Sequence, residues 1–188
     1  MAKVKLAGGA FNYPKPIVLV GATVDGRPNF LTVGWMSRVD LAPAYLAIAI
    51  GRERYTTRGV EEHGTFSVNL PGRGLVAPTD YVGLNSGEEV EKAGVFDVFY
   101  GELETAPMIG ECPLCVECRV IQKVELHHVN LYVGEEVAAY ADESIVVAGE
   151  PDIIKADSFL LAMPAKKYVT VGDAFADAYS IGREYKAE

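Results

Sequence analysis

Cysteine is scarce in this sequence: the 188 residues include three, and all of them lie in one segment, ECPLCVECRV, as Cys112, Cys115 and Cys118. An odd, clustered set argues against a secreted scaffold held by disulfides. The C-x2-C-x2-C spacing also occurs in iron–sulfur ligand runs, but such a cluster normally takes four thiolates and no fourth cysteine exists. Because the segment favours a strand, we expect small buried side chains and no metal, with Cys112 and Cys118 on one face and Cys115 on the other.

Long apolar runs are also missing. No run approaches the roughly 20 residues that a membrane-spanning helix needs. The N-terminal MAKVKLAGGAFNYPKP has a short apolar run broken by glycine and proline, which makes a poor signal peptide, so we expect a cytoplasmic protein. The formal net charge of −9 argues against broad binding to nucleic acid or anionic membranes. A local cationic site for a small anion is still compatible with that charge, because it needs only a few residues.

The motifs of several common enzyme classes are absent as well. The sequence has no G-x-G-x-x-G after a strand, no G-x-x-x-x-G-K-[ST], no H-E-x-x-H and no G-x-S-x-G. Rossmann dehydrogenases, P-loop enzymes, zincins and α/β-hydrolases therefore lose their main support. Any redox role would have to use a cofactor held by a different fold.

What the sequence does contain is mostly β-strand pattern. IVLVGATV (17–24) and FLTVGWMS (30–37) flank a turn, DGRPN, and predict a hairpin. After a break at VDLAPA, YLAIAI (45–50) is apolar on both alternations and predicts a strand buried on both faces. TFSVNLP and two long runs, PLCVECRVIQKVEL and HVNLYVGEEVAAYA, add further strands.

Helical patterns are short. YTTRGVEEHG predicts one helix that closes at His63, and the glycine-rich stretch 72–100 predicts small helical pieces that include GEEVEKAG. We see no repeat or linker, so we expect residues 1–188 to form one mainly β domain, an antiparallel barrel with helical insertions. In ELHHVN, adjacent histidines on a strand would point to opposite faces, which argues against a metal shared by His127 and His128.

Two local features could carry chemistry. In GRERYTTRG, the cations Arg52, Arg54 and Arg58 surround Thr56 and Thr57 at the expected start of a helix, a combination that suits a phosphate. The alternative is a solvated arginine cluster beside an ordinary helix cap. Further upstream, Trp35 ends a strand among polar neighbours, which suits a flat aromatic ligand, although a lone tryptophan is more often part of a core.

Taken together, several segments resemble the flavin reductase-like family of FMN-binding split barrels, which includes flavoredoxins. They are PKPIVLVGATVDGRPNFLTVGWMSRV, GRERYTT, GTFSVNLP, GLNSGEEVEKAGV, ECPLCVECRV, VGEEVAAYAD and YSIGREYK. The resemblance implies a six-stranded antiparallel split barrel, usually a homodimer with FMN near the subunit interface. It also implies an oxidoreductase that takes hydride from NAD(P)H or exchanges electrons with a redox protein, or else a non-enzymatic flavin carrier.

The same resemblance implies which residues contact the cofactor. Flavin contacts would come from the hairpin, at Asn29, Thr32, Trp35, Met36 and Ser37. The FMN phosphate would be held by Arg54, Thr56 and Thr57. Ser86 and Lys92, in NSGEEVEK, would lie near the cofactor. No catalytic acid, base or nucleophile is expected from the protein, because the flavin supplies the redox chemistry.

Overall fold

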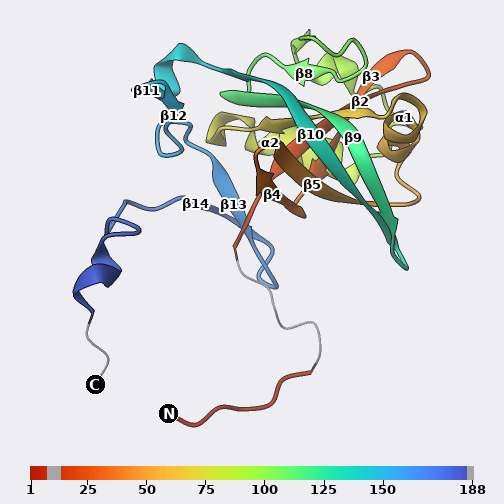
Figure 1. Cartoon of the computed structure of the whole chain (residues 1–188). Helices are drawn as coiled ribbons and strands as arrows, with labels where there is room; N and C mark the ends of the chain where they lie inside the picture. The colour runs from red at the N-terminus through yellow and green to blue at the C-terminus, as the bar shows by residue number, and fades with distance from the viewer. Residues whose placement is uncertain (8–13, 186–188) are drawn as a thin grey trace.

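The computed structural model describes residues 1–7 and 14–185 (Figure 1). Residues 8–13, whose glycines interrupt the N-terminal apolar run, and residues 186–188, which include the end of YSIGREYK, lie outside the described residues. No helix in the described part of the chain is long and apolar enough to cross a bilayer.

Seven antiparallel strands form the main sheet, which curls around one hydrophobic core. Their spatial order is β3 (Arg27–Val33), β2 (Val18–Val24), β6 (Thr65–Leu70), β9 (Leu114–Glu125), β10 (Val129–Ala141), β5 (Ala44–Gly51) and β4 (Met36–Leu41). The prediction of a mainly β, antiparallel fold is confirmed, but the sheet is not closed and has seven strands in place of six.

The extra strand arises because the predicted strand 30–37 is two strands. β3 pairs with β2 and lies at one edge of the sheet, whereas β4 pairs with β5 and lies at the other. Only Gly34 and Trp35 separate them, and the Trp35 carbonyl accepts a hydrogen bond from the Ala49 backbone N–H at 2.9 Å. The two edges of the curled sheet therefore meet at these two residues, which we call the seam. The segment predicted to break the chain at VDLAPA instead extends β4 as far as Leu41.

β2 runs through the middle of the protein and is buried along its whole length. Val18, Val20 and Ala22 face the core inside the sheet, while Leu19 packs outside it against Val82 of α2 (Val76–Leu84). The predicted double-sided burial of residues 45–50 is only partly right. In β5, Leu46, Ile48 and Ile50 face the core, but the opposite face includes the half-buried Ala49, because β5 lies next to an edge strand.

The remaining elements are short. α1 (Tyr55–His63) ends at Gly64, whose φ of 63° is left-handed, so the predicted helix is confirmed. GEEVEKAG is mainly a turn, and only its last two residues are helical, as the start of the 3-10 turn η2 (Ala93–Val95). The other 3-10 turns are η1 (Arg73–Leu75), η3 (Glu143–Ile145) and η4 (Ile181–Glu184). Small sheets are formed by β1 (Lys15–Pro16), β13 (Phe159–Ala162) and β14 (Lys167–Thr170), by β7 (Val98–Phe99) and β8 (Met108–Ile109), and by β11 (Val146–Val147) and β12 (Glu150–Pro151).

All three cysteines are buried free thiols. Cys115 and Cys118 lie on opposite faces of β9, as predicted, but Cys112 shares a cluster with Cys115 and not with Cys118. That part of the prediction is wrong because Cys112 precedes the strand, where the period of two does not apply. Burial raises the pKa of both Cys115 and Cys118 to about 12, so these thiols stay protonated. No cluster of metal-binding side chains occurs among residues 1–7 and 14–185.

A buried carboxylate fixes the loop that precedes β8. Glu117 on β9 is fully buried and accepts hydrogen bonds from the backbone N–H groups of Glu102 and Leu103, each at 2.7 Å. The Tyr140 hydroxyl donates a third bond at 2.9 Å. These three donors satisfy the buried Glu117 carboxylate, so Glu117 anchors the loop to β9.

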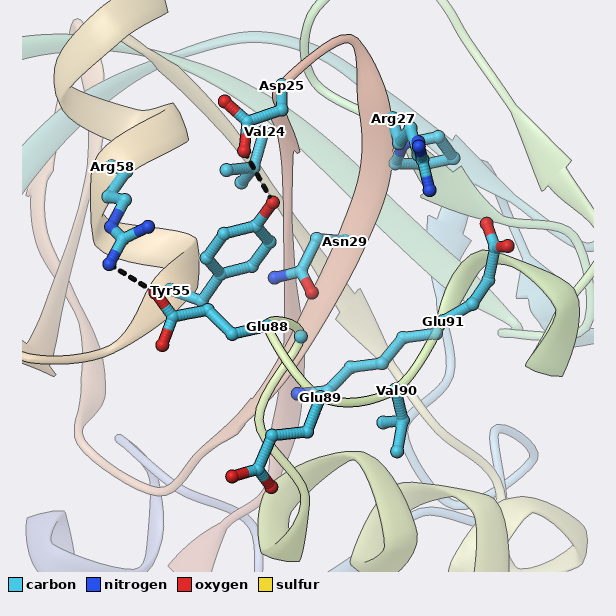
Figure 2. Close-up of a pocket in the computed structure, with 13 residues that line it drawn as sticks. Val24, Asp25, Arg27, Asn29, Tyr55, Arg58, Glu88, Glu89, Val90 and Glu91 are labelled. Carbon is cyan, nitrogen blue, oxygen red and sulfur yellow. Dashed lines mark hydrogen bonds and ion pairs between the residues drawn. The ribbon is translucent and has the colours of Figure 1, made fainter.

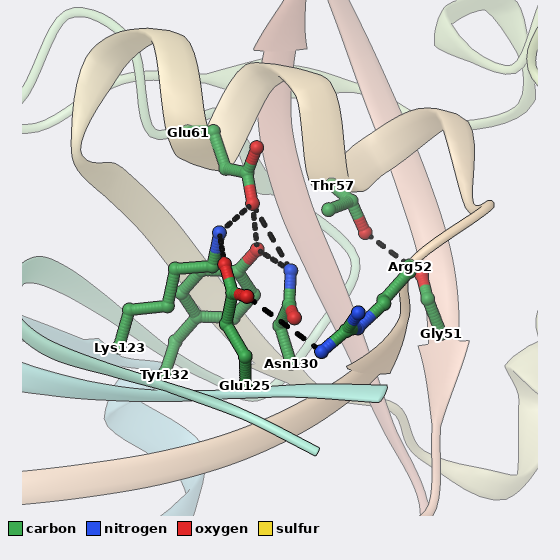
Figure 3. A network of polar contacts seen from close by, with 8 residues as sticks. All are labelled: Gly51, Arg52, Thr57, Glu61, Lys123, Glu125, Asn130 and Tyr132. Carbon is green, nitrogen blue, oxygen red and sulfur yellow. Dashed lines mark hydrogen bonds and ion pairs between the residues drawn. The ribbon is translucent and has the colours of Figure 1, made fainter. Parts of the chain in front are cut away.

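A network of polar side chains also joins α1 to strands β9 and β10 (Figure 3). Glu61 accepts hydrogen bonds from Tyr132 at 2.8 Å and Asn130 at 3.0 Å, and pairs with Lys123 at 2.7 Å. His127 and His128 lie nearby in the chain, in the turn between β9 and β10, with ring centroids 4.3 Å apart. The expectation that they point to opposite faces of a strand is therefore wrong, because they are not in a strand.

Candidate functional site

A groove with a volume of about 350 Å³ opens beside the seam. Its walls come from β3, the seam, β5 and β13, and it ends at Arg54. The residues that the later argument uses are Thr32, Trp35, Ala49, Gly51, Arg54 and Leu161. We call it the seam groove. Small residues in β5 leave space here, so the groove is a consequence of alanine and glycine on that face of the strand.

A second cavity, of about 210 Å³, continues from the first. The two share Leu31 and Arg54, so they are neighbours along one surface depression. The second is lined by residues 53–56 at the start of α1 and by residues 85–87 and Lys92 after α2. We call it the cationic cavity, because two positive residues, Arg54 and Lys92, line it beside one acidic residue, Glu53.

Arg54 is the exposed cation of this pair. Its neighbours Arg52 and Arg58 are paired with carboxylates, whereas Arg54 forms no ion pair within residues 1–7 and 14–185. The guanidinium donors of Arg54 are therefore available to an anion in the cavity that it lines.

Lys92 is the buried cation. Its Nζ donates to the backbone carbonyls of Val82 at 2.7 Å and Phe30 at 3.1 Å, which leaves one N–H of the ammonium for a ligand. Burial, and then the charge of Arg54, lower the pKa of Lys92 to about 8. Because the positive charges of Arg54 and Lys92 repel each other, an anion bound between them is favoured.

The hydroxyls at the start of α1 have different positions. Thr56 lines the cationic cavity, and its Oγ1 accepts a hydrogen bond from Asn29 Nδ2 at 2.7 Å, so its own hydrogen can still be donated. Thr57 is buried and donates to the Gly51 carbonyl at 3.0 Å on the side shown in Figure 3. The structure thus places Thr56 at the cavity, Asn29 behind it, and Thr57 against the loop that carries Arg54.

Trp35 is 55% exposed, so it is not part of the core. Lys15 Nζ lies 5.5 Å from the centre of its ring. Met36 and Ser37 line a neighbouring hollow, which shares Gly34, Trp35 and Ala49 with the seam groove, but they do not line the groove itself. Thr32 does line the seam groove, and its hydroxyl donates to the Thr79 carbonyl of α2.

Sequence reasoning missed several residues of the seam groove. Leu161 and Met163 come from the C-terminal part of the chain, where β13 pairs with β1 and so lies beside Lys15. No local pattern could have indicated them, since the pairing joins residues far apart in the sequence. Ala49 and Gly51 could have been found, because small residues in an otherwise bulky strand often mark a close approach.

The two cavities together describe the chemistry of a ligand. The seam groove is mostly apolar and is bordered by an exposed tryptophan, which suits a flat ring system. The cationic cavity offers two positive charges and two hydroxyls, Thr56 and Ser86, which suits a phosphate. A molecule with a flat ring at one end and a phosphate at the other fits this arrangement.

The sequence comparisons identify the family. Residues 10–151 match the family model described as "Flavin reductase like domain". The chain belongs to the flavin reductase-like family. The match covers most of the chain and every residue of the two cavities except Leu161 and Met163.

Solved structures agree with this assignment. The flavoredoxin from Methanosarcina acetivorans is 47% identical, with a TM-score of 0.95 and coverage of 97% of this chain and 98% of that one. Flavoredoxin of Desulfovibrio vulgaris (Miyazaki F) is 33% identical, with a TM-score of 0.88 and coverage of 96% and 100%. An uncharacterized protein from Aeropyrum pernix is 33% identical over 132 residues, and the chain spans about half the length of that relative (68% of this chain, 50% of that protein). The family match and the flavoredoxin neighbours support a flavin-related redox role.

Proposed function

We propose that the protein binds FMN with the ring in the seam groove and the phosphate in the cationic cavity. The observation that carries the proposal is the position of Arg54, which borders both cavities and pairs with no carboxylate among the described residues. Arg54, Lys92, Ser86 and Thr56 would hold the phosphate. Trp35 and Thr32 would border the ring, with Met36 and Ser37 at its outer side.

Asn29 and Thr57 take supporting roles in this proposal. Asn29 fixes the hydroxyl of Thr56, and Thr57 ties the start of α1 to Gly51, so both hold the phosphate-binding groups in place. Bound flavin would supply hydride or electron transfer, and the chain would bind it, orient it and exclude water from its inner face. The exposed side of the groove leaves room for NAD(P)H or a redox protein as electron partner.

We further propose that residues 1–188 act as one domain and that the protein forms a homodimer. Pairing of β1 with β13 joins the two ends of the chain, which supports a single domain. Beyond β14, Phe175 and Tyr179 are 98% and 95% exposed, and Figure 1 shows this C-terminal segment running away from the main sheet. Exposed apolar side chains on this scale favour burial against another chain.

The visible spectrum of the purified protein tests flavin binding. We expect flavin absorption, or its appearance when FMN is added. A colourless protein that fails to take up FMN would contradict the proposal. Steady oxidation of NADH or NADPH by the FMN-loaded protein would then indicate an oxidoreductase.

A second candidate function is an electron carrier or flavin carrier, which the flavoredoxin neighbours favour. It predicts stoichiometric FMN with no turnover of either pyridine nucleotide.

Analytical ultracentrifugation tests the proposed homodimer. A single monomeric species at micromolar concentration would refute it.

A further inference from the structure

The hollows around the proposed site differ in the charges that line them. A hollow of about 480 Å³ lies between the β2–β3 turn, the start of α1 and the loop 87–92 (Figure 2). Its lining contains more acidic than basic residues: Asp25, Glu88, Glu89 and Glu91 against Arg27, Arg58 and Lys92. The cationic cavity includes Glu53. In the seam groove, by contrast, the charged lining residues are Lys15 and Arg54, and both are positive. A negative charge in the seam groove therefore meets no carboxylate among the lining residues that the structure describes.

Lys15 lies at the Trp35 side of the seam groove. It belongs to β1 and pairs with Leu161 of β13, another lining residue, so the small sheet fixes its backbone. Its Nζ is 5.5 Å from the centre of the Trp35 ring, and a Cβ added at Gly34 would lie 4.0 Å from its Cδ. The aliphatic stem of Lys15 therefore lies along the seam, with the ammonium group beside the tryptophan that borders the groove.

The two cations of the seam groove have different partners once FMN is bound. Arg54 also lines the cationic cavity, where the phosphate of the proposed complex would compensate the charges of Arg54 and Lys92. Lys15 does not line the cationic cavity, and it forms no ion pair within residues 1–7 and 14–185. The positive charge of Lys15 is thus available to the ring end of the ligand.

We propose that Lys15 stabilises the reduced flavin ring and so raises the reduction potential of the bound FMN. When a neutral flavin ring takes up two electrons and one proton, it gains one negative charge. A cation fixed at the groove stabilises the negatively charged ring more than the neutral one, because its charge is already in place when the ring is reduced. This inference rests on the proposed function, because it assigns a role in the same site.

The test is an anaerobic redox titration of the FMN-loaded protein at pH 7 and low salt, with free FMN as the reference. The shift in potential from free FMN gives the ratio of the affinities for reduced and oxidised FMN. Lys15→Met keeps most of the stem and loses the charge, so this ratio should fall about fivefold, which is about 20 mV for a two-electron couple. Lys15→Arg keeps the charge and should leave the ratio within about twofold of wild type.

Lys167→Met provides the matched control. Lys167 is exposed on β14 of the same small sheet and lines neither cavity of the proposed site. Its loss changes the net charge of the protein by the same amount as Lys15→Met. Because solvent and salt screen a distant exposed charge, the ratio should stay within about twofold of wild type.

The outcomes separate this inference from the proposed function. An unchanged ratio in Lys15→Met, or an equal fall in Lys167→Met, would overturn the role of Lys15 and leave the FMN site standing. An unchanged ratio with a raised KM for NADPH but not for NADH would assign Lys15 to a phosphate of the electron donor, against the inference. Wild-type protein that takes up no FMN would instead refute the proposed function. If Lys15→Met does not fold, Lys15→Gln removes the same charge and gives the same comparison.

Discussion

Replacing Arg54 with alanine separates the phosphate from the ring as sources of affinity. Hydrogen bonds to charged groups contribute about 1.5–3 kcal/mol, but Arg54 is exposed, so solvent and salt reduce its contribution. We take about 1.4 kcal/mol, which corresponds to about a tenfold weaker FMN complex. Riboflavin lacks the phosphate, so its affinity should stay within about twofold.

The protonation of Lys92 determines the pH at which that experiment should be done. Its pKa of about 8 is lowered in part by Arg54, so the Arg54→Ala change raises this pKa and would leave more charge on Lys92 at alkaline pH. At pH 7 the lysine is already about nine-tenths protonated, so the compensation is negligible there. Quenching of flavin fluorescence at pH 7 and low salt therefore reports the contribution of Arg54 alone.

Arg52→Ala provides the matched control. Arg52 lies two residues away but points to Glu125, 3.7 Å distant, in the network of Figure 3 and lines neither cavity of the proposed site. Its loss should leave FMN affinity within about twofold. If Arg54→Ala weakened riboflavin as much as FMN, or if Arg52→Ala had the same effect on FMN as Arg54→Ala, the phosphate assignment would be refuted.

Three other predictions follow from the same structure. FMN affinity should fall about fivefold as pH rises through 8, because Lys92 loses its positive charge there, and Lys92→Met should flatten this profile in the same fluorescence titration. Glu117→Ala should lower the free energy of unfolding by about 3–5 kcal/mol in urea, since three donors lose their acceptor; a loss below 1 kcal/mol would contradict the anchor role. Cys115→Ser should retain the flavin spectrum, because the thiol is buried in the cluster beside α2, and loss of all colour would show that interpretation to be wrong.

Local patterns predicted much of the fold. Short-range periodicity specifies the strands β2, β6 and β9, and the left-handed Gly64 specifies the end of α1. The split of residues 30–37 was missed because strand propensity continues through Trp35, and only the curl of the whole sheet separates the two halves. For the site, charge and hydroxyl content identified Arg54 and Thr56 as candidates. The bond from Thr57 to Gly51 and the position of Leu161 beside the seam groove depend on packing between segments, which a single sequence does not reveal.

The seam has a consequence for the protein without its cofactor. β3 and β4 are the two edge strands of the sheet; β3 is largely buried, but β4 is exposed beyond Met36, and exposed edges are templates for pairing with other chains. The proposed flavin site lies where those edges meet, so a bound ligand would shield part of the surface most prone to aggregation. Retention of cofactor and solubility would then be linked, and preparations that lose flavin should also be the first to precipitate.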